Sequence, residues 1–367
     1  MNMRHMRALA VVVAALLGMT ACNKEIPKPE PVTPPSTEGR TVAAQQLDYS
    51  AGAARKPRSM VCHDGKVYVS CGYPPAILRI DTASGQIDRM LKIESDYDLE
   101  GMVESQGKLF VASSFIQTTS GILYDNIVIV VDINSFSIER TIAVPKDPDR
   151  MKAVDDSHIM VLCGNGLDAP LTSVLINTST YEVQELGHEY MALDTRDGAV
   201  YAYSGGGYAQ PATYYRLAPL TNSEEQILAS CGIEHPYSIN CIGEDIYLTT
   251  NEYDGSKGDV IRLGADGTRQ WSCEAGMLPS KVVPVGDGTA YVLNQGNWGE
   301  NEASLSRVAM DNGSITNNIF SAANGRALGD VAQDLVVYGS KAYITVSFSN
   351  TVEIINTKDN TATQIAL

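Results

Sequence analysis

The amino-acid sequence predicts an all-β protein: a single-domain, seven-bladed β-propeller of four-stranded antiparallel blades. The first observation is a repeated pattern of a turn, an apolar residue, usually an aromatic, and a second apolar residue, as in Gly65-Lys66-Val67-Tyr68-Val69. The central position recurs at residues 68, 110, 160, 201, 247, 291 and 343, which are 41 to 52 residues apart. A period in the forties, with short strands between Gly- and Asp-rich turns, is typical of propeller blades rather than of helical repeats.

The chain begins with a predicted bacterial lipoprotein signal over residues 1–21, which is left out of the fold. Arg4 and Arg7 precede an apolar run that is too short to span a bilayer. Met19-Thr20-Ala21-Cys22 resembles a lipobox, so we expect cleavage before Cys22 and lipidation of that cysteine. An ordinary secretory signal cleaved after Ala21 is the alternative.

Residues 22–42 are predicted to be an extended linker behind the lipidated cysteine. Prolines alternate there with Lys, Glu, Ser and Thr, a composition that cannot form a core. Lys24-Glu25 resembles the short surface-export signal of Bacteroidota lipoproteins. We therefore expect a protein anchored by lipid to the outer membrane and facing the cell exterior.

Residues 43–367 are assigned to the propeller. The first blade is predicted from strands near residues 60–62, 67–70, 77–80 and 87–93, with the strong hairpin turn Asp64-Gly65 between the first two. Blades are expected to start near residues 57, 100, 148, 189, 236, 279 and 330, and the fourth blade is the least regular. The last blade has four strands of its own, so residues 41–49 either add a strand or replace one.

Composition excludes some partners. The formal net charge is −16 at pH 7, and the chain has no basic runs, which argues against nucleic acid. Six cysteines follow Cys22, and none of them forms a C-x-x-C pair. Cys71 and Cys163 occupy equivalent places in their blades, so we interpret them as small core residues rather than as disulfide partners.

A ligand site is expected on one face of the ring. In a four-stranded blade, the loop between the second and third strands and the connection to the next blade open on the same face. These segments are the long ones here, including a predicted loop over residues 113–126, and they carry aromatics and a few cations. The candidate ligand-binding residues are Tyr97, Tyr124, Arg150, His235, Tyr237, Tyr253, Asn297, Trp298 and Arg326. The alternative is that these aromatics only pack the loops together.

Motifs for catalysis are scarce. The sequence has no G-x-S-x-G elbow, no H-E-x-x-H and no P-loop. His188 and His235 are expected one blade apart on the loop-rich face, where solvated side chains are a better interpretation than metal ligands. We therefore predict no catalytic residue, no metal site and no cofactor.

The blade segments "GKVYV", "RIDTASGQI" and "VVDINSFSI" resemble those of YncE-like β-propellers. Asn294-Gln295-Gly296-Asn297-Trp298-Gly299 and Gly329-Asp330-Val331-Ala332-Gln333 resemble segments of Bacteroidota surface lipoprotein propellers that include the BtuG-type proteins. The BtuG-type members capture cobalamin outside the cell and pass it to an outer-membrane transporter. In those relatives the Gln-Gly-Asn-Trp-like segment opens the domain, whereas here it falls in the sixth blade, so the resemblance implies a circularly permuted ring.

The resemblance implies a non-enzymatic lipoprotein that binds cobalamin or another corrinoid as a ligand and hands it to a TonB-dependent transporter of the outer membrane. Two alternatives remain open. One is a protein- or glycan-binding scaffold of another surface uptake system. The other is a metal-dependent, lactonase-like propeller enzyme, which needs converging carboxylates at the ring axis.

Overall fold

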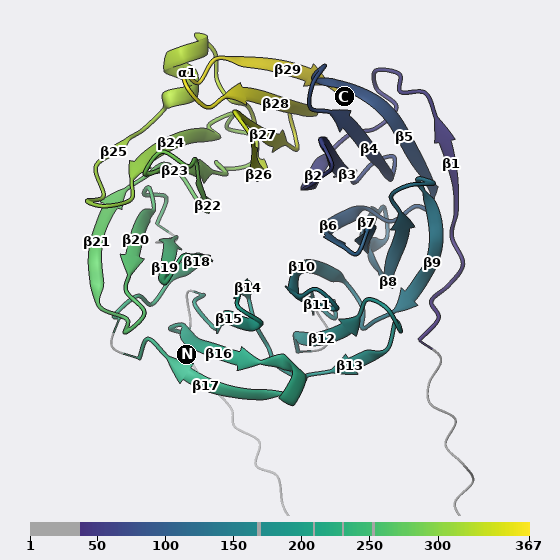
Figure 1. Cartoon of the computed structure of the whole chain (residues 1–367), viewed down its shortest axis with the longest axis horizontal. Coiled ribbons are helices and arrows are strands. Elements are labelled where there is room, and N and C mark those ends of the chain that lie inside the picture. The colour runs from purple at the N-terminus through teal and green to yellow at the C-terminus, as the bar shows by residue number, and fades with distance from the viewer. Residues whose placement is uncertain (1–36, 167–169, 208–209, 230, 252–253) are drawn as a thin grey trace, which may run out of the picture. The chain divides into compact units, whose positions relative to one another are not determined.

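A computed structural model describes residues 37–166, 170–207, 210–229, 231–251 and 254–367. The predicted signal segment, Cys22 and the linker up to residue 36 lie outside the described residues. Seven antiparallel sheets stand around a common axis, as the sequence predicts (Figure 1). Among the described residues, no helix is long and apolar enough to cross a membrane.

Each blade contributes four consecutive strands, ordered from the axis outward. The first strands are β2 (Pro57–His63), β6 (Leu99–Ser105), β10 (Pro148–Asp155), β14 (Ala192–Arg196), β18 (Pro236–Ile242), β22 (Pro279–Pro284) and β26 (Ala332–Tyr338). The second strands are β3 (Lys66–Cys71), β7 (Lys108–Thr118), β11 (His158–Cys163), β15 (Ala199–Ser204), β19 (Asp245–Thr250), β23 (Thr289–Asn294) and β27 (Lys341–Val346).

The outer half of each blade completes the sheet. The third strands are β4 (Ala76–Asp81), β8 (Gly121–Asp132), β12 (Thr172–Asn177), β16 (Thr213–Ala218), β20 (Asp259–Leu263), β24 (Ser304–Ala309) and β28 (Thr351–Asn356). The fourth strands are β5 (Gln86–Glu94), β9 (Ser137–Ala143), β13 (Val183–Glu185), β17 (Ser223–Ile227), β21 (Arg269–Glu274), β25 (Ile315–Thr316) and β29 (Ala362–Ala366). The short helices η1 (Pro219–Thr221) and α1 (Ile319–Asn324) interrupt this pattern.

The second blade differs from the expectation in one respect. Residues 113–126, predicted to be a loop, instead extend the β7–β8 hairpin, with Phe115 paired to Tyr124 and Thr118 to Gly121. Aromatic and β-branched residues in this stretch favour extended pairing. The long hairpin places Ile122 and Leu123, both exposed, above the loop-rich face.

Hydrophobic packing joins the blades rather than filling each one separately. The repeated central residue lies in the second strand of every blade and is buried. Its exposed fraction runs from 0% for Tyr343 to 7% for Tyr201. Each belongs to a cluster shared with the next blade: Tyr68 packs with the second blade and Tyr291 with the seventh. The seven clusters thus correspond to the seven blade interfaces.

The ring closes between the seventh and first blades, and neither of these blades contributes a strand to the sheet of the other. Tyr343 of β27 packs among Met60, Val67 and Leu78 of the first blade. Across the same junction, the backbone N–H of Met60 donates to Asp334 Oδ2 at 2.7 Å, and Thr345 Oγ1 donates to the carbonyl of Arg58 at 2.8 Å. Closure therefore relies on side-chain packing and hydrogen bonds.

The N-terminal segment resolves the alternative left open for residues 41–49. It adds a strand, β1 (Ala43–Leu47), which pairs antiparallel with β5 as a fifth strand of the first blade. Just before it, residues 37–39 hydrogen-bond to the outer strand β9 of the second blade. Figure 1 shows this segment running along the outside of β9 and β5. It joins two blades at their outer edges.

Substitutions of Tyr343 test the closing seam. Tyr343→Ala should destabilise the protein by about 3–5 kcal/mol, since it opens a cavity between blades one and seven. Tyr343→Phe should be neutral or stabilise by about 1 kcal/mol, because the tyrosine hydroxyl is buried without a hydrogen-bond partner. Urea unfolding measures both. Leu220→Ala, at an exposed turn residue, is the control. An alanine variant as stable as the wild type would show that the seam contributes little.

Candidate functional site

A cavity of about 540 Å³ lies at the ring axis and is lined by residues of all seven blades. We call it the axial cavity. Its walls come mainly from the first strands, and in six of these the pairing with the second strand is irregular, as between Pro57 and Met60 and between Leu99 and Met102. Such bulges redirect side chains at strand starts. Here they lie at the loop-rich end of the axis, where charged residues line the cavity.

Charged pairs connect neighbouring blades around the axial cavity. Arg58 Nε donates to Glu100 Oε2 at 2.6 Å between the first two blades. Lys152 of the third blade lies 3.0 Å from Asp194 of the fourth, and Lys281 of the sixth contacts Asp334 of the seventh. The carboxylate of Asp194 raises the pKa of Lys152, although burial opposes this. The cavity wall is therefore polar and charged, in contrast to the packed blade interfaces.

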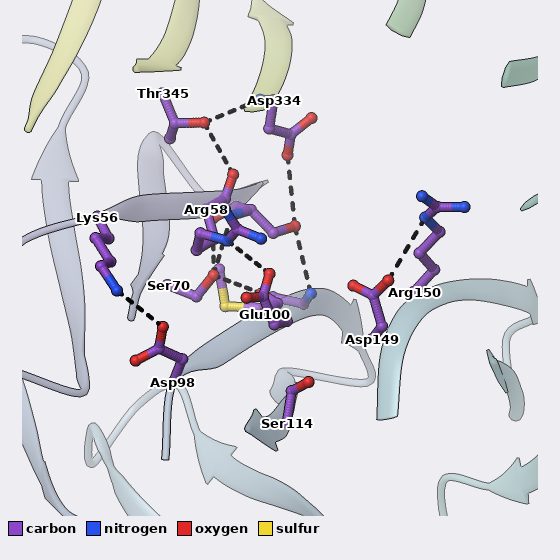
Figure 2. A network of polar contacts seen from close by, with 12 residues as sticks. Lys56, Arg58, Ser70, Asp98, Glu100, Ser114, Asp149, Arg150, Asp334 and Thr345 are labelled. Atoms are coloured by element: carbon purple, nitrogen blue, oxygen red, sulfur yellow. Dashed lines mark hydrogen bonds and ion pairs between the residues drawn. The ribbon is translucent and has the colours of Figure 1, made fainter. Parts of the chain in front are cut away.

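Glu100 is the most constrained of these groups. Its side chain is buried, Oε2 accepts from Arg58, and Oε1 has no hydrogen-bond partner. Burial raises the pKa of Glu100 to about 7 against the lowering effect of Arg58, and the negative charges of Asp149 and Asp98 raise it further. Figure 2 shows Glu100 with Arg58, Asp98 and Asp149 around it. A buried carboxyl with a spare oxygen is a candidate ligand contact.

A second hollow of about 350 Å³, the side pocket, opens beside the axial cavity on the loop-rich face. The two share Arg58, Glu100, Asp149 and Arg150 as lining residues. The outer wall of the side pocket comes from the extended hairpin of the second blade and from the connection before the fourth. Together the two hollows form one continuous candidate site at the mouth of the ring.

Three of the predicted ligand-binding residues line these hollows. Tyr124 lines the side pocket, Tyr237 the axial cavity, and Arg150 both. The Tyr237 hydroxyl donates to Gln295 Oε1, and Arg150 Nη1 donates to the carbonyl of Met191. Their placement follows from their positions in loops and blade connections on one face.

Other predicted residues lie outside both hollows. Tyr97 packs under the guanidinium of Arg40, 5.2 Å from its ring centre. His235 Nδ1 lies 3.3 Å from the carbonyl oxygen of Gly206. Arg326 forms a two-point ion pair with buried Glu353, at 2.9 and 2.6 Å.

Asn297 and Trp298 lie in the loop between β23 and β24. Asn297 donates to Glu302 Oε1 through its backbone N–H at 2.9 Å and its side chain at 2.6 Å, which stabilises the loop. Trp298 is 73% exposed and makes an edge contact with Phe348. Tyr253 lies outside the described residues.

The two segments that carried the family resemblance contact each other. The backbone N–H of Gly299 donates to the carboxylate of Asp330 at 3.0 Å, and the N–H of Ala332 donates to the carbonyl of Gln295 at 3.1 Å. Gly296 has a φ of +76°, and a Cβ there would lie 2.6 Å from the backbone nitrogen of Ala303. These motif residues hold the loop between β23 and β24 of blade six against the connection that leads into blade seven.

Sequence reasoning missed several charged residues of the axial wall. The sequence pattern does not single out Arg58, Glu100, Asp149 and Asp334, which fall at or near predicted blade starts. A signal is present, since charged residues recur at the starts of the first strands. A charge in a buried strand needs a partner or a cavity, and the ring axis provides both.

His188 and His158 have local partners. His188 lies 3.2 Å from Glu224 and stacks on Tyr190, and His158 contacts Asp155. Among the described residues, no group of three His, Cys, Asp or Glu side chains is arranged to hold a metal ion. The six cysteines after Cys22 are free thiols in the structure, and burial raises the pKa of Cys62 to about 11.

No protein-family model and no curated protein matches this chain. Solved structures match at the level of fold. The WD40 domain of Neurospora crassa Pan2 is 13% identical, with a TM-score of 0.57 over 83% of this chain and 93% of that one. A putative 6-phosphogluconolactonase from Bacteroides uniformis is 13% identical, with a TM-score of 0.55 over 89% and 97%. An uncharacterised Listeria monocytogenes protein, 10% identical, has a TM-score of 0.55 over 88% and 98%. This structural similarity establishes the β-propeller fold of the chain.

Glu100 provides a pH test. Its folded pKa of about 7 exceeds the ordinary value of 4.5, so the folded state holds a proton that the unfolded state releases. This carboxyl therefore favours folding in acid, and its contribution falls as pH rises from about 4.5 to about 7. Glu100→Gln removes that dependence. The stability of Glu100→Gln relative to wild type should increase by about 2 kcal/mol from pH 5 to pH 8. Urea unfolding at both pH values measures the free energy of unfolding of each protein. The same change in that free energy for both proteins between pH 5 and pH 8 would contradict the prediction.

Proposed function

We propose that the protein captures a small molecule at the mouth of the ring and is not an enzyme. The ligand class we favour is cobalamin or another corrinoid, a large flat macrocycle edged with amide groups. The observation that carries the proposal is a gathering of exposed apolar side chains around a polar cavity on one face.

The exposed apolar side chains are unevenly distributed. Among the described residues, eight large hydrophobic side chains are exposed. Six of these belong to loops, hairpin tips or blade connections of the loop-rich face: Tyr73, Ile122, Leu123, Met191, Trp298 and Phe348. Leu220, in η1, and Tyr338, at the end of β26, lie on the opposite face of the ring. Exposed apolar groups gathered on one face of a soluble domain favour a binding surface.

Polar groups at the centre of this face complement an amide-edged ligand. Arg150 is exposed at the junction of the axial cavity and the side pocket, and Tyr237 and Gln295 line the axial wall nearby. Aromatic rims cover flat apolar faces, while guanidinium, hydroxyl and amide groups fix orientation through hydrogen bonds. Arg326 is engaged by Glu353 and would contribute through the loop it supports rather than through its charge.

The proposed setting follows from the N-terminal sequence. A lipidated Cys22 and an extended linker would hold the ring at the surface of the outer membrane. A TonB-dependent transporter would then receive the ligand. The N-terminal segment contacts the outer edges of the first two blades, which leaves the loop-rich face free of the tether within the described residues.

A protein partner is the second candidate. The same six apolar side chains are spread over five blades and their connections, a wider area than one small ligand covers. Such a surface fits a polypeptide that sits across the mouth of the ring. In that case the chain would bind an outer-membrane transporter directly and show no affinity for cobamides.

Titration with cyanocobalamin tests the corrinoid proposal. We expect binding at micromolar ligand or below, followed by absorbance or calorimetry. Trp298→Ala should weaken it at least tenfold, since an exposed indole on the rim contributes stacking area. Leu220→Ala, which removes an exposed side chain from the opposite face, should leave affinity unchanged. Wild-type protein that does not bind cyanocobalamin at micromolar concentrations would rule the corrinoid out.

A further inference from the structure

The side pocket has two chemically different walls. One wall is apolar and aromatic, with Phe115, Tyr124 and Tyr190 among its residues. The other is acidic and carries Glu100, Asp147 and Asp149. A pocket of about 350 Å³ with this division matches a compact molecule that has an apolar body and a positively charged end.

The acidic wall has an unused hydrogen-bond acceptor. Glu100 is 5% exposed, and its Oε1 has no partner although Oε2 is held by Arg58 at 2.6 Å. A buried carboxylate oxygen without a donor is costly, and the bound state of a ligand can supply the donor. A ligand N–H at Oε1 would complete the coordination of this carboxylate.

The acidic wall carries three carboxyl groups but two cationic side chains, Arg58 and Arg150. Asp147 accepts a hydrogen bond from Ser114 at 2.6 Å, and it takes part in no ion pair within the described part of the chain. Burial raises the pKa of Asp147, and the charge of Asp149 adds to this effect. Arg150 Nε lies 3.7 Å from Asp149 Oδ2, and its Nη1 donates to the Met191 carbonyl. Arg58 and Arg150 thus lie against two of the three carboxyl groups, and a ligand cation would offset the charge of the third.

The geometry favours an organic cation over a metal ion. No three carboxylates or other metal-binding side chains converge among the described residues. The aromatic wall would face the body of an organic ligand, and Tyr124 lies close to the backbone of Gly166 on that side. Aromatic rings beside carboxylates are a suitable environment for an ammonium group on an apolar stem.

We propose that the side pocket is a binding site for a primary amine carried on an aromatic or apolar body. The ammonium group donates to Glu100 Oε1 and lies near Asp149, and the body packs against Tyr124 and Phe115. The site does not depend on the corrinoid, whose peripheral amides are neutral, and it extends the proposed function to a second ligand class.

Three probes of one shape test the proposal. Phenethylamine, 2-phenylethanol and phenylacetate differ in charge at the same end of the molecule. Calorimetric or ligand-observed NMR titration of the mature protein at pH 8 should show at least tenfold tighter binding of the amine than of the alcohol, and no binding of the acid. Equal affinity for amine and alcohol would overturn the proposal, whatever the result with cyanocobalamin.

Variants then assign the contact. Glu100→Gln keeps the shape of the side chain and should bring the affinities for amine and alcohol within about threefold of each other. Asp149→Asn changes a more accessible carboxylate and should weaken the binding of the amine severalfold. This variant provides the test if Glu100→Gln does not fold. Asp311→Asn removes one charge from an exposed turn on the opposite face and should change nothing. Amine selectivity that survives both pocket variants would show that the amine binds elsewhere.

Discussion

Packing between neighbouring blades is the interaction on which the rest of the structure depends. Each repeated central residue, such as Tyr68 or Tyr291, is buried in a cluster shared with the following blade. A single four-stranded blade has two apolar faces and cannot cover either alone, so each blade is stable only between two others. Hydrophobic burial therefore acts around the circumference, and the last interface, around Tyr343, must close like the other six.

This arrangement leaves the axis for polar chemistry. Apolar side chains are used between the blades, while the first strands face a cavity that only seven blades together enclose. Bulges at the starts of these strands direct Arg58, Glu100 and Lys152 into it, and partners come from adjacent blades. Three ion pairs of this wall join neighbouring blades, whereas Asp149 and Arg150 pair within the third blade. Most of the charged wall is thus a property of the assembled ring.

The repeat was sufficient to predict the blades, because a buried second strand after a tight turn has the same local pattern each time. Blade starts are within three residues of their predicted positions. The site was predicted only in part. Tyr124, Arg150 and Tyr237 reach the cavities because their loops open on the expected face. Arg326 and Tyr97 do not, since their partners, Glu353 and Arg40, come from segments that local sequence does not relate to them.

The course of the N-terminal segment has a mechanical consequence. A pull on the chain ahead of residue 37 would first strain the hydrogen bonds of Thr37 and Gly39 to β9, and then the Arg40–Asp125 contact. Only after these ruptured would β1 peel from β5. The seam between blades one and seven is loaded only after β1 has peeled, through Tyr49, whose hydroxyl donates to the carbonyl of Ala366. A propeller built this way can yield first at its rim when its N-terminal segment is pulled.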